Sequence, residues 1–202
     1  MSGRLLLAAV LTFALAGCGS EDGSNDAAST QPTTVTQTVI ETETVAQEPE
    51  VTCSTASVRQ TLPEQDLPPA VADVRKRIFD AAIACDYDTL EQIALEKGEG
   101  FTFSYGPGTS AAEHWRTLEQ NGEGPLSVLA IILTMPYTRN ETGSYAWPTA
   151  YQESPSEADW KRLVDAGLYS QSQIDSMKAG GYVGYRTAIT PDGDWQFFVA
   201  GD

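Results

Sequence analysis

The stretch Pro125-Leu-Ser-Val-Leu-Ala-Ile-Ile-Leu-Thr-Met135 is apolar at almost every position. Proline is tolerated in the first turn of a helix, and Pro136 ends the run, so the stretch predicts a helix of about 11 residues. A helix that is apolar nearly all round is buried, and about 20 residues are needed to cross a bilayer. The sequence therefore places this helix at the centre of the core of a folded domain.

A second helix is predicted upstream, where apolar residues recur at spacings of three and four. It opens at Pro68-Pro69, and its apolar face carries Val71, Val74, Ile78, Ala81, Ala82 and Cys85. The same spacing places most of Arg75, Lys76, Arg77 and Asp80 on the other face, so we expect these side chains to be solvated. Cys85 is expected on the buried side, at the end of the helix.

Four capping patterns indicate the starts of shorter helices. In each pattern, an Asp or Ser that can cap a helix is followed three positions later by Glu or Gln. The patterns are Asp88-Thr-Leu-Glu91, Ser110-Ala-Ala-Glu113, Ser154-Pro-Ser-Glu157 and Ser170-Gln-Ser-Gln173. Glycines at positions 98, 122, 167 and 180 are expected to end these helices.

Alternating residues predict strands. Phe101-Thr-Phe-Ser-Tyr105 alternates aromatic and small polar side chains, which is typical of a half-buried strand. At the C-terminus, residues 182–190 and 195–200 flank the turn residues Pro191-Asp-Gly-Asp194, which predicts a hairpin. In the last strand, one face is expected to carry Trp195, Phe197 and Val199, and the other Gln196, Phe198 and Ala200. Because both faces are apolar, this strand is predicted to be central in its sheet.

These elements together predict an α+β fold. We expect several short helices packed on an antiparallel sheet that is closed by a C-terminal β-hairpin, after a disordered N-terminal tether. The order of a helix, then Cys85-Asp-Tyr-Asp-Thr-Leu90, then a terminal sheet resembles an NTF2-like domain. The resemblance covers only those few residues, and it implies a curved sheet that forms a cup for a ligand.

The formal charge of −16 is spread along the chain. Residues 1–18 carry only Arg4, or +1. Residues 19–66 carry nine acidic side chains against Arg59, or −8, and residues 67–202 carry 19 acidic against 10 basic side chains, or −9. The only tight basic cluster is Arg75-Lys-Arg77. Nucleic acids and anionic lipids are both bound through clustered basic residues, so the charge argues against nucleic acid as a partner and against membrane binding by electrostatics.

The N-terminus resembles the signal peptide of a bacterial lipoprotein. Arg4 precedes an apolar run over residues 5–15, which is too short to cross a bilayer and is typical of a secretory signal. The run ends in Leu15-Ala-Gly-Cys18, which resembles a lipobox. In that family the chain is cut before the cysteine, and the cysteine sulfur carries a diacylglyceryl group.

The resemblance implies a signal peptide over residues 1–17 and a lipid on Cys18, with further acylation of the new N-terminus. The membrane is then a partner through this lipid, and the protein is held on the extracytoplasmic side of the cell membrane. The alternative is an ordinary secretory signal followed by a chance cysteine, which would leave a free secreted protein.

Residues 18–50 are rich in Thr, Ser, Gln and acidic side chains. Beyond Cys18 they include no aromatic residue and no Leu, so the segment cannot bury enough apolar surface to offset the entropy of ordering. We expect a disordered linker that lifts a single globular domain, residues 51–202, off the membrane. Thr, Val and acidic residues alternate over 34–45, which leaves a strand as the alternative there.

Cys53 and Cys85 are the two cysteines that remain once Cys18 is acylated. Outside the cytoplasm an isolated pair most simply forms a disulfide, which would staple the start of the domain to its first helix. A redox pair or a metal site is the alternative, but the two are not in Cys-x-x-Cys spacing and one histidine cannot complete a ligand set. The sequence therefore predicts a disulfide, no metal and no cofactor.

Candidate functional residues are few. His114 is the only histidine, and it is a weak candidate for acid–base catalysis because the N-terminal dipole of its helix disfavours the protonated ring. Tyr137, Tyr145, Trp147 and Tyr151 lie in a segment with little regular structure, where they could stack on a sugar or pack on a peptide. Covering the core beside the apolar helix is the alternative role for these four.

Three functions remain compatible with the sequence. The first is a lipoprotein whose domain binds a protein or small-molecule partner without turning it over. The second is an extracytoplasmic hydrolase that uses His114 or paired carboxylates, and the third is a structural component of the envelope. The chain has no Gly-x-Ser-x-Gly motif and no phosphate-binding loop, which favours binding over catalysis.

Overall fold

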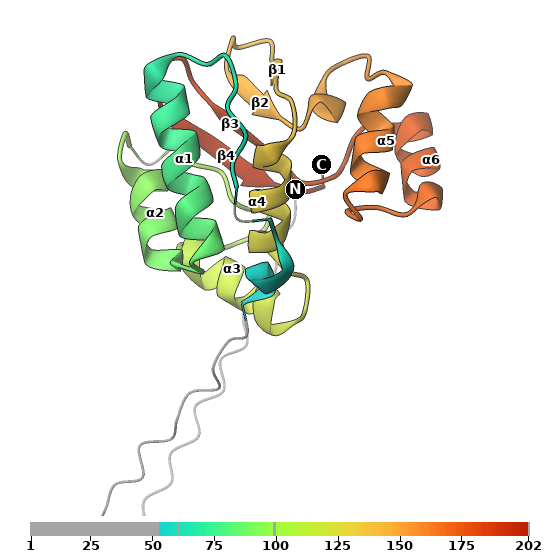
Figure 1. The fold of residues 1–202 in the computed structure, drawn as a ribbon. Helices are drawn as coiled ribbons and strands as arrows, with labels where there is room; N and C mark the ends of the chain where they lie inside the picture. The colour runs from blue at the N-terminus through green and yellow to red at the C-terminus, as the bar shows by residue number, and fades with distance from the viewer. Residues whose placement is uncertain (1–52, 60, 99, 202) are drawn as a thin grey trace, which may run out of the picture. The chain divides into compact units, whose positions relative to one another are not determined.

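The chain folds into short helices and a small antiparallel sheet, as Figure 1 shows. The structure is a computed structural model, and it describes residues 53–201 apart from residues 60 and 99. The predicted signal peptide (1–17), the lipid on Cys18 and the predicted linker (18–50) lie outside the described residues. The α+β fold with its closing C-terminal hairpin is confirmed.

The helices are η1 (Ser54–Ser57), α1 (Pro69–Ile83), α2 (Tyr87–Leu95), α3 (Ala111–Gln120), α4 (Pro125–Thr134), η2 (Thr149–Tyr151), α5 (Glu157–Asp165) and α6 (Gln171–Gly180), where η denotes a 3-10 helix. The strands are β1 (Thr138–Arg139), β2 (Tyr145–Trp147), β3 (Arg186–Ile189) and β4 (Trp195–Val199).

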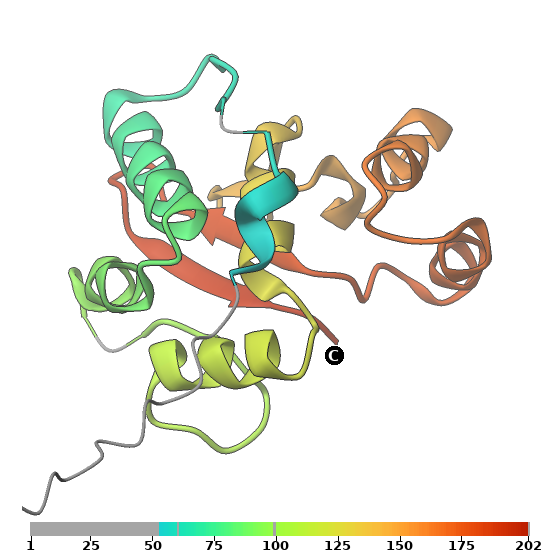
Figure 2. The ribbon, with the colours of Figure 1, turned by 60° about the horizontal axis from the view of Figure 1, so that its bottom comes forward.

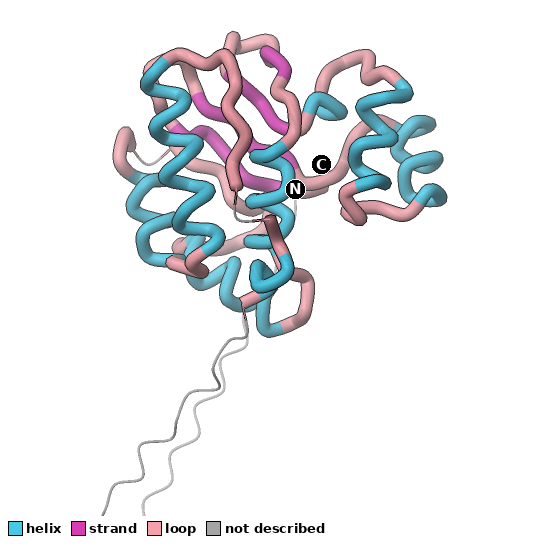
Figure 3. The backbone as a smooth tube through the Cα atoms, viewed as in Figure 1, coloured by secondary structure: helices cyan, strands magenta, loops and turns pink. Residues whose placement is uncertain are grey.

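Helix α4 is the predicted central helix, and it is buried as expected. Pro125 occupies its first turn after Gly124, whose positive φ of 59° suits glycine. Leu126, Leu129 and Leu133 are fully buried in the main hydrophobic cluster. In Figure 3, α1 and α4 lie in front of the sheet, while α5 and α6 form a pair to one side. None of the helices in the described part of the chain has the length and hydropathy to cross a membrane.

The four strands follow the order β1-β2-β3-β4, with antiparallel neighbours. The prediction that the last strand is central is therefore wrong, because β4 is at the end of that order. Its outer edge is nevertheless covered by Thr102, which donates from its amide to Gln196 O (3.0 Å) and accepts from Phe198 N (3.0 Å).

The strand predicted over Phe101-Thr-Phe-Ser-Tyr105 does not form, apart from the single bridge between Thr102 and Phe197. The backbone pairing stops directly afterwards, and the hydroxyl of Ser104 accepts a hydrogen bond from Gly106 N (2.9 Å). The alternation of aromatic and polar residues is real, but only Thr102 meets a partner strand.

A bulge in the hairpin changes which residues of β4 share a face. Ile189 pairs with Trp195, but Ala188 pairs with Phe197, so Gln196 is the extra residue. Trp195 and Phe198 therefore both face the helices, and their rings lie 5.9 and 6.0 Å from the ring of Trp115. The predicted grouping of Trp195 with Phe197 and Val199 is wrong for this reason.

The basic cluster on α1 is only partly solvated. Lys76 and Arg77 are exposed as expected, but Arg75 is 3% exposed. Arg75 lies four residues after Val71 and three before Ile78, on the face that packs into the core. Its guanidinium donates to the backbone oxygens of Leu133 and Pro63, which the helical spacing alone does not reveal.

Two helix starts differ from the predicted caps. The cap of α2 is Asp86, which accepts from Thr89 N (2.9 Å), in place of Asp88. The cap of α5 is Ser156, in place of Ser154: it accepts from Asp159 N, and the Asp159 carboxylate accepts from Ser156 N in return. The caps at Ser110 and Ser170 are where the sequence predicts them.

Replacing Ser156 with alanine is expected to lower the free energy of unfolding by about 1 kcal/mol, because the first turn of α5 loses its capping hydroxyl. Ser154→Ala removes the same hydroxyl two residues earlier and is expected to change the free energy by less than about 0.5 kcal/mol. Denaturant titration of both variants measures the difference. Equal losses would show that Ser156 is not the residue that starts the helix.

Candidate functional site

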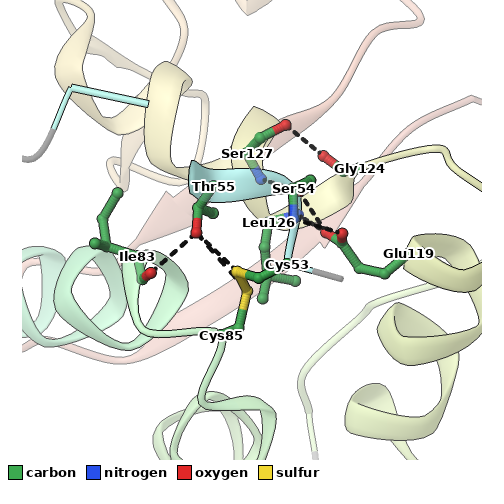
Figure 4. The surroundings of a disulfide bond; sticks show 9 residues. All are labelled: Cys53, Ser54, Thr55, Ile83, Cys85, Glu119, Gly124, Leu126 and Ser127. Atoms are coloured by element: carbon green, nitrogen blue, oxygen red, sulfur yellow. Dashed lines mark hydrogen bonds between the residues drawn. A yellow bond between two sulfur atoms is a disulfide. The ribbon is translucent and has the colours of Figure 1, made fainter. Parts of the chain in front are cut away.

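The predicted disulfide between Cys53 and Cys85 is present, with the two Cα atoms 6.0 Å apart. Figure 4 shows it beside Thr55, whose hydroxyl donates to Ile83 O at the end of α1 (2.9 Å). Cys85 lies just beyond α1 and not within it, and it is half-buried with a positive φ of 52°. The bridge joins the start of the described chain to the turn between α1 and α2.

A buried carboxylate, Glu119, holds the same segment from the other side (Figure 4). It accepts from Ser54 N (3.1 Å), from the Ser54 hydroxyl (2.8 Å) and from Leu126 N in the first turn of α4 (3.0 Å). Figure 2 shows η1 lying against α4 as a result. With three donors on its oxygens, Glu119 has a structural role, and sequence reasoning missed it.

His114 lies on α3, where its ring is 5.5 Å from the ring of Phe103. The ring is half-buried, and among the described residues it forms neither a hydrogen bond nor an ion pair with a carboxylate. The described structure therefore gives His114 no acid with which to share a proton.

The predicted aromatic set is divided between two places. Tyr137, Tyr145 and Trp147 lie together, with the Tyr137 ring 5.2 Å from Tyr145 and 6.0 Å from Trp147. Tyr145 and Trp147 belong to the main hydrophobic cluster, and Trp147 is fully buried. These three residues therefore cover the core, which is the alternative that the sequence left open. Tyr151 lies elsewhere.

Tyr151 is on η2 and contacts the opposite face of the sheet. Ala146 pairs with Ala188, and Ala188 pairs with Phe197, so these three residues share a face. Arg186, two residues before Ala188, shares it as well. The Tyr151 ring lies edge-on to the ring of Phe197 at 6.0 Å. The main hydrophobic cluster lies on the other face, which carries Trp147, Ile189, Trp195 and Phe198.

Arg186 is the charged residue of this second face, and it is only 7% exposed. Its Nη2 donates to the hydroxyl of Tyr105 (3.0 Å), and its Nη1 donates to Gly184 O (3.3 Å). The Cζ atom lies 5.3 Å from the centroid of the Tyr151 ring and 6.0 Å from that of Tyr105. We call these three residues, Arg186, Tyr105 and Tyr151, the Arg186 site.

No carboxylate balances this charge within the described part of the chain. Over residues 53–201, without 60 and 99, every ion pair within 4.0 Å involves another basic residue. Buried charges are usually paired, so the Arg186 site is a place where an external group could complete the balance.

Two tyrosine hydroxyls contact the backbone of Tyr185, the residue before Arg186. The Tyr182 hydroxyl donates to Tyr185 O (2.7 Å), and the Tyr169 hydroxyl accepts from Tyr185 N (2.9 Å). A Cβ at Gly184 would lie 2.6 Å from both hydroxyl oxygens, so only glycine fits there. Burial raises the pKa of Tyr169 and Tyr182, and it raises the pKa of Tyr185 to about 12. All three stay neutral at physiological pH and hold the start of β3.

A surface hollow of about 590 Å³ adjoins the site at Tyr151. It is lined by residues 138–142, at the start of the sheet, and by residues 151–153. Arg139 lies on this wall with its Cζ 4.1 Å from the centroid of the Tyr145 ring. Tyr151 is the one residue of the Arg186 site that lines this hollow, whose lining also includes Glu141 and Glu153.

Within the described residues, no three His, Cys, Asp or Glu side chains come close enough together to hold a metal ion.

Comparison of the chain with protein-family models, with curated proteins and with solved structures finds no match. The resemblances to lipoprotein signals and to NTF2-like domains therefore stay predictions.

Proposed function

We propose that this protein is a membrane-anchored lipoprotein of the cell envelope, whose extracytoplasmic domain binds a ligand or partner without turning it over. The disulfide between Cys53 and Cys85 is the observation that supports an extracytoplasmic location, because disulfides persist in oxidising compartments outside the cytoplasm. The lipobox-like Leu15-Ala-Gly-Cys18 supplies the anchor in this proposal, and the acidic segment after it supplies the spacer.

Binding is supported by the chemistry of the Arg186 site. A guanidinium between two tyrosine rings offers hydrogen-bond donors and flat surfaces to a ligand. The hydroxyls of Tyr169 and Tyr182 behind it are neutral and engaged with the backbone, so they position the site without acting as bases. His114, the residue on which a histidine-dependent hydrolase would depend, packs on Phe103 instead.

The test is metabolic labelling with palmitate of the full chain, expressed in a bacterium that processes lipoproteins. The label is expected in a membrane-bound product that begins at Cys18. Cys18→Ser is expected to abolish the label and to leave uncut precursor, whereas Cys85→Ser, the matched control, keeps the label. Recovery of an unmodified chain from the cytosol with Met1 still attached would overturn the proposal.

A further inference from the structure

We propose that Arg186 binds the oxyanion of a ligand, a carboxylate or phosphate group, which takes the place of the Tyr105 hydroxyl. The proposed function supplies the premise that the domain binds a ligand, and this inference names the class of that ligand. The charges and contacts around Arg186 are the evidence for the class.

Arg186 differs from three arginines that pair with carboxylates nearer the surface. Arg116 pairs with Asp88 (2.6 Å), Arg162 with Asp159 (2.8 Å) and Arg77 with Glu96 (2.8 Å). The sequence has 28 acidic residues, so carboxylates are abundant. Arg186 is more deeply buried than these three, and yet no described carboxylate lies within 4.0 Å of it.

Arg75 shows how this protein satisfies a buried arginine when the role is structural. Its guanidinium donates twice to Leu133 O (3.1 and 2.7 Å) and once to Pro63 O (3.0 Å). Leu133 O is among the last carbonyls of α4, at the negative end of the helix dipole. Among the described residues, Arg186 donates to one backbone oxygen, at 3.3 Å, and to one neutral hydroxyl. Its donors are therefore less completely used than those of Arg75.

Tyr105 can be displaced from Arg186. Its side chain is 57% exposed, and it precedes Gly106-Pro-Gly108 in a loop without regular structure. An exposed side chain on such a loop moves at small cost, because few buried contacts hold it. When Tyr105 moves, the Nη2 atom that donated to its hydroxyl is free to donate to a ligand. A guanidinium prefers carboxylate and phosphate oxygens, which it contacts through two parallel hydrogen bonds.

Hydrogen bonds hold the segment that carries Tyr151 in place. Tyr151 follows Thr149, whose hydroxyl donates to the buried carboxylate of Asp159 (2.7 Å). The next residue, Gln152, donates to the same carboxylate (3.1 Å). The segment that carries Tyr151 is therefore held beside Arg186, whereas Tyr105 is an exposed residue of a loop. The site thus combines a rigid wall, a buried cation and a displaceable cover.

The experiment is a nuclear magnetic resonance titration of the full chain carrying Cys18→Ser, which removes the lipid. Inorganic phosphate and acetate are the two probes, and sodium chloride at matched ionic strength is the control. We expect the side-chain Nε–H signal of Arg186 and the ring signals of Tyr105 to shift and saturate with one or both probes. The probe that binds more tightly tells whether the natural group is a phosphate or a carboxylate.

Two variants give opposite expected results. Arg186→Lys keeps the charge but loses the paired donors, so the affinity for the better probe is expected to fall about tenfold. Tyr105→Phe removes only the competing hydroxyl, so the affinity is expected to rise about threefold. Arg116→Gln is the matched control. The Arg116 guanidinium also lies near a tyrosine ring, 4.9 Å from the centroid of Tyr87, but it is already paired with Asp88. Its replacement is expected to leave the affinity for the probe unchanged.

The inference is overturned if the Arg186 signal responds to phosphate and acetate no more than to chloride. It is also overturned if Tyr105→Phe weakens binding, because the hydroxyl would then be a partner of the anion and not its substitute. Neither result affects palmitate labelling at Cys18, so a failure of this inference is distinguishable from a failure of the proposed lipoprotein function.

Discussion

Replacing Cys53 and Cys85 together with alanine is expected to lower the free energy of unfolding by about 3–4 kcal/mol. The bridge closes a loop with a sequence separation of 32, and without it the unfolded chain gains the freedom that the loop removes. Such a loss is a large part of the stability of an ordinary domain. Denaturant titration of the oxidised parent and of the double variant measures it.

Reduction of the parent protein by a thiol reagent is expected to give the same loss, since it opens the same loop without changing a residue. Without the bridge, η1 is still held by Ser54, whose amide and hydroxyl donate to Glu119, and by the Thr55 hydroxyl, which donates to Ile83 O. A loss below about 1 kcal/mol would show that this carboxylate, and not the bridge, fixes the start of the domain.

Replacing Arg75 with methionine is expected to lower the free energy of unfolding by about 3 kcal/mol or more. Methionine keeps part of the apolar stem but leaves the carbonyl oxygens of Leu133 and Pro63 without the donors they now have. Burial lowers the pKa of Arg75 to about 10, so the guanidinium remains charged at neutral pH and its hydrogen bonds are of the stronger, charge-assisted kind.

Arg77→Met is the matched control, two residues further along the same helix. Arg77 is exposed and pairs with Glu96 at the surface, where an ion pair contributes at most about 1 kcal/mol. Denaturant titration of the two variants under the same conditions should separate them clearly. Similar losses would contradict the burial of Arg75 and support a solvated basic cluster.

The sequence predicts the helices well because they depend on local patterns. The apolar run at 125–135 and the spacing of Val71, Val74 and Ile78 describe faces that must be buried wherever the helices pack. The sequence predicts the caps of α2 and α5 two residues from their true positions, because both Asp86 and Asp88, and both Ser154 and Ser156, are good capping residues. Which one caps depends on how the preceding loop approaches the helix.

The order of the strands and the Arg186 site depend on contacts between distant residues. Tyr105 and Arg186 are 81 positions apart, and no local pattern pairs them. The bulge at Gln196 shifts the register of β4, so strict alternation assigned Trp195 to the wrong face. The local sequence offers one signal for the site, which is an arginine at the start of the uncharged segment Thr187-Ala-Ile189. The partners of this arginine, Tyr105 and Tyr151, are known only from the folded structure.

The bridge at Thr102 also affects whether two copies of this protein can pair through the edges of their sheets. A strand with open amides invites pairing with a neighbouring chain, which leads to aggregation or strand exchange. Here Thr102 already occupies the amide of Phe198 and the carbonyl of Gln196 on the longest strand, and β1, at the other end of the sheet, is only two residues long. Crowding of this domain is therefore not expected to join copies through the edges of this sheet.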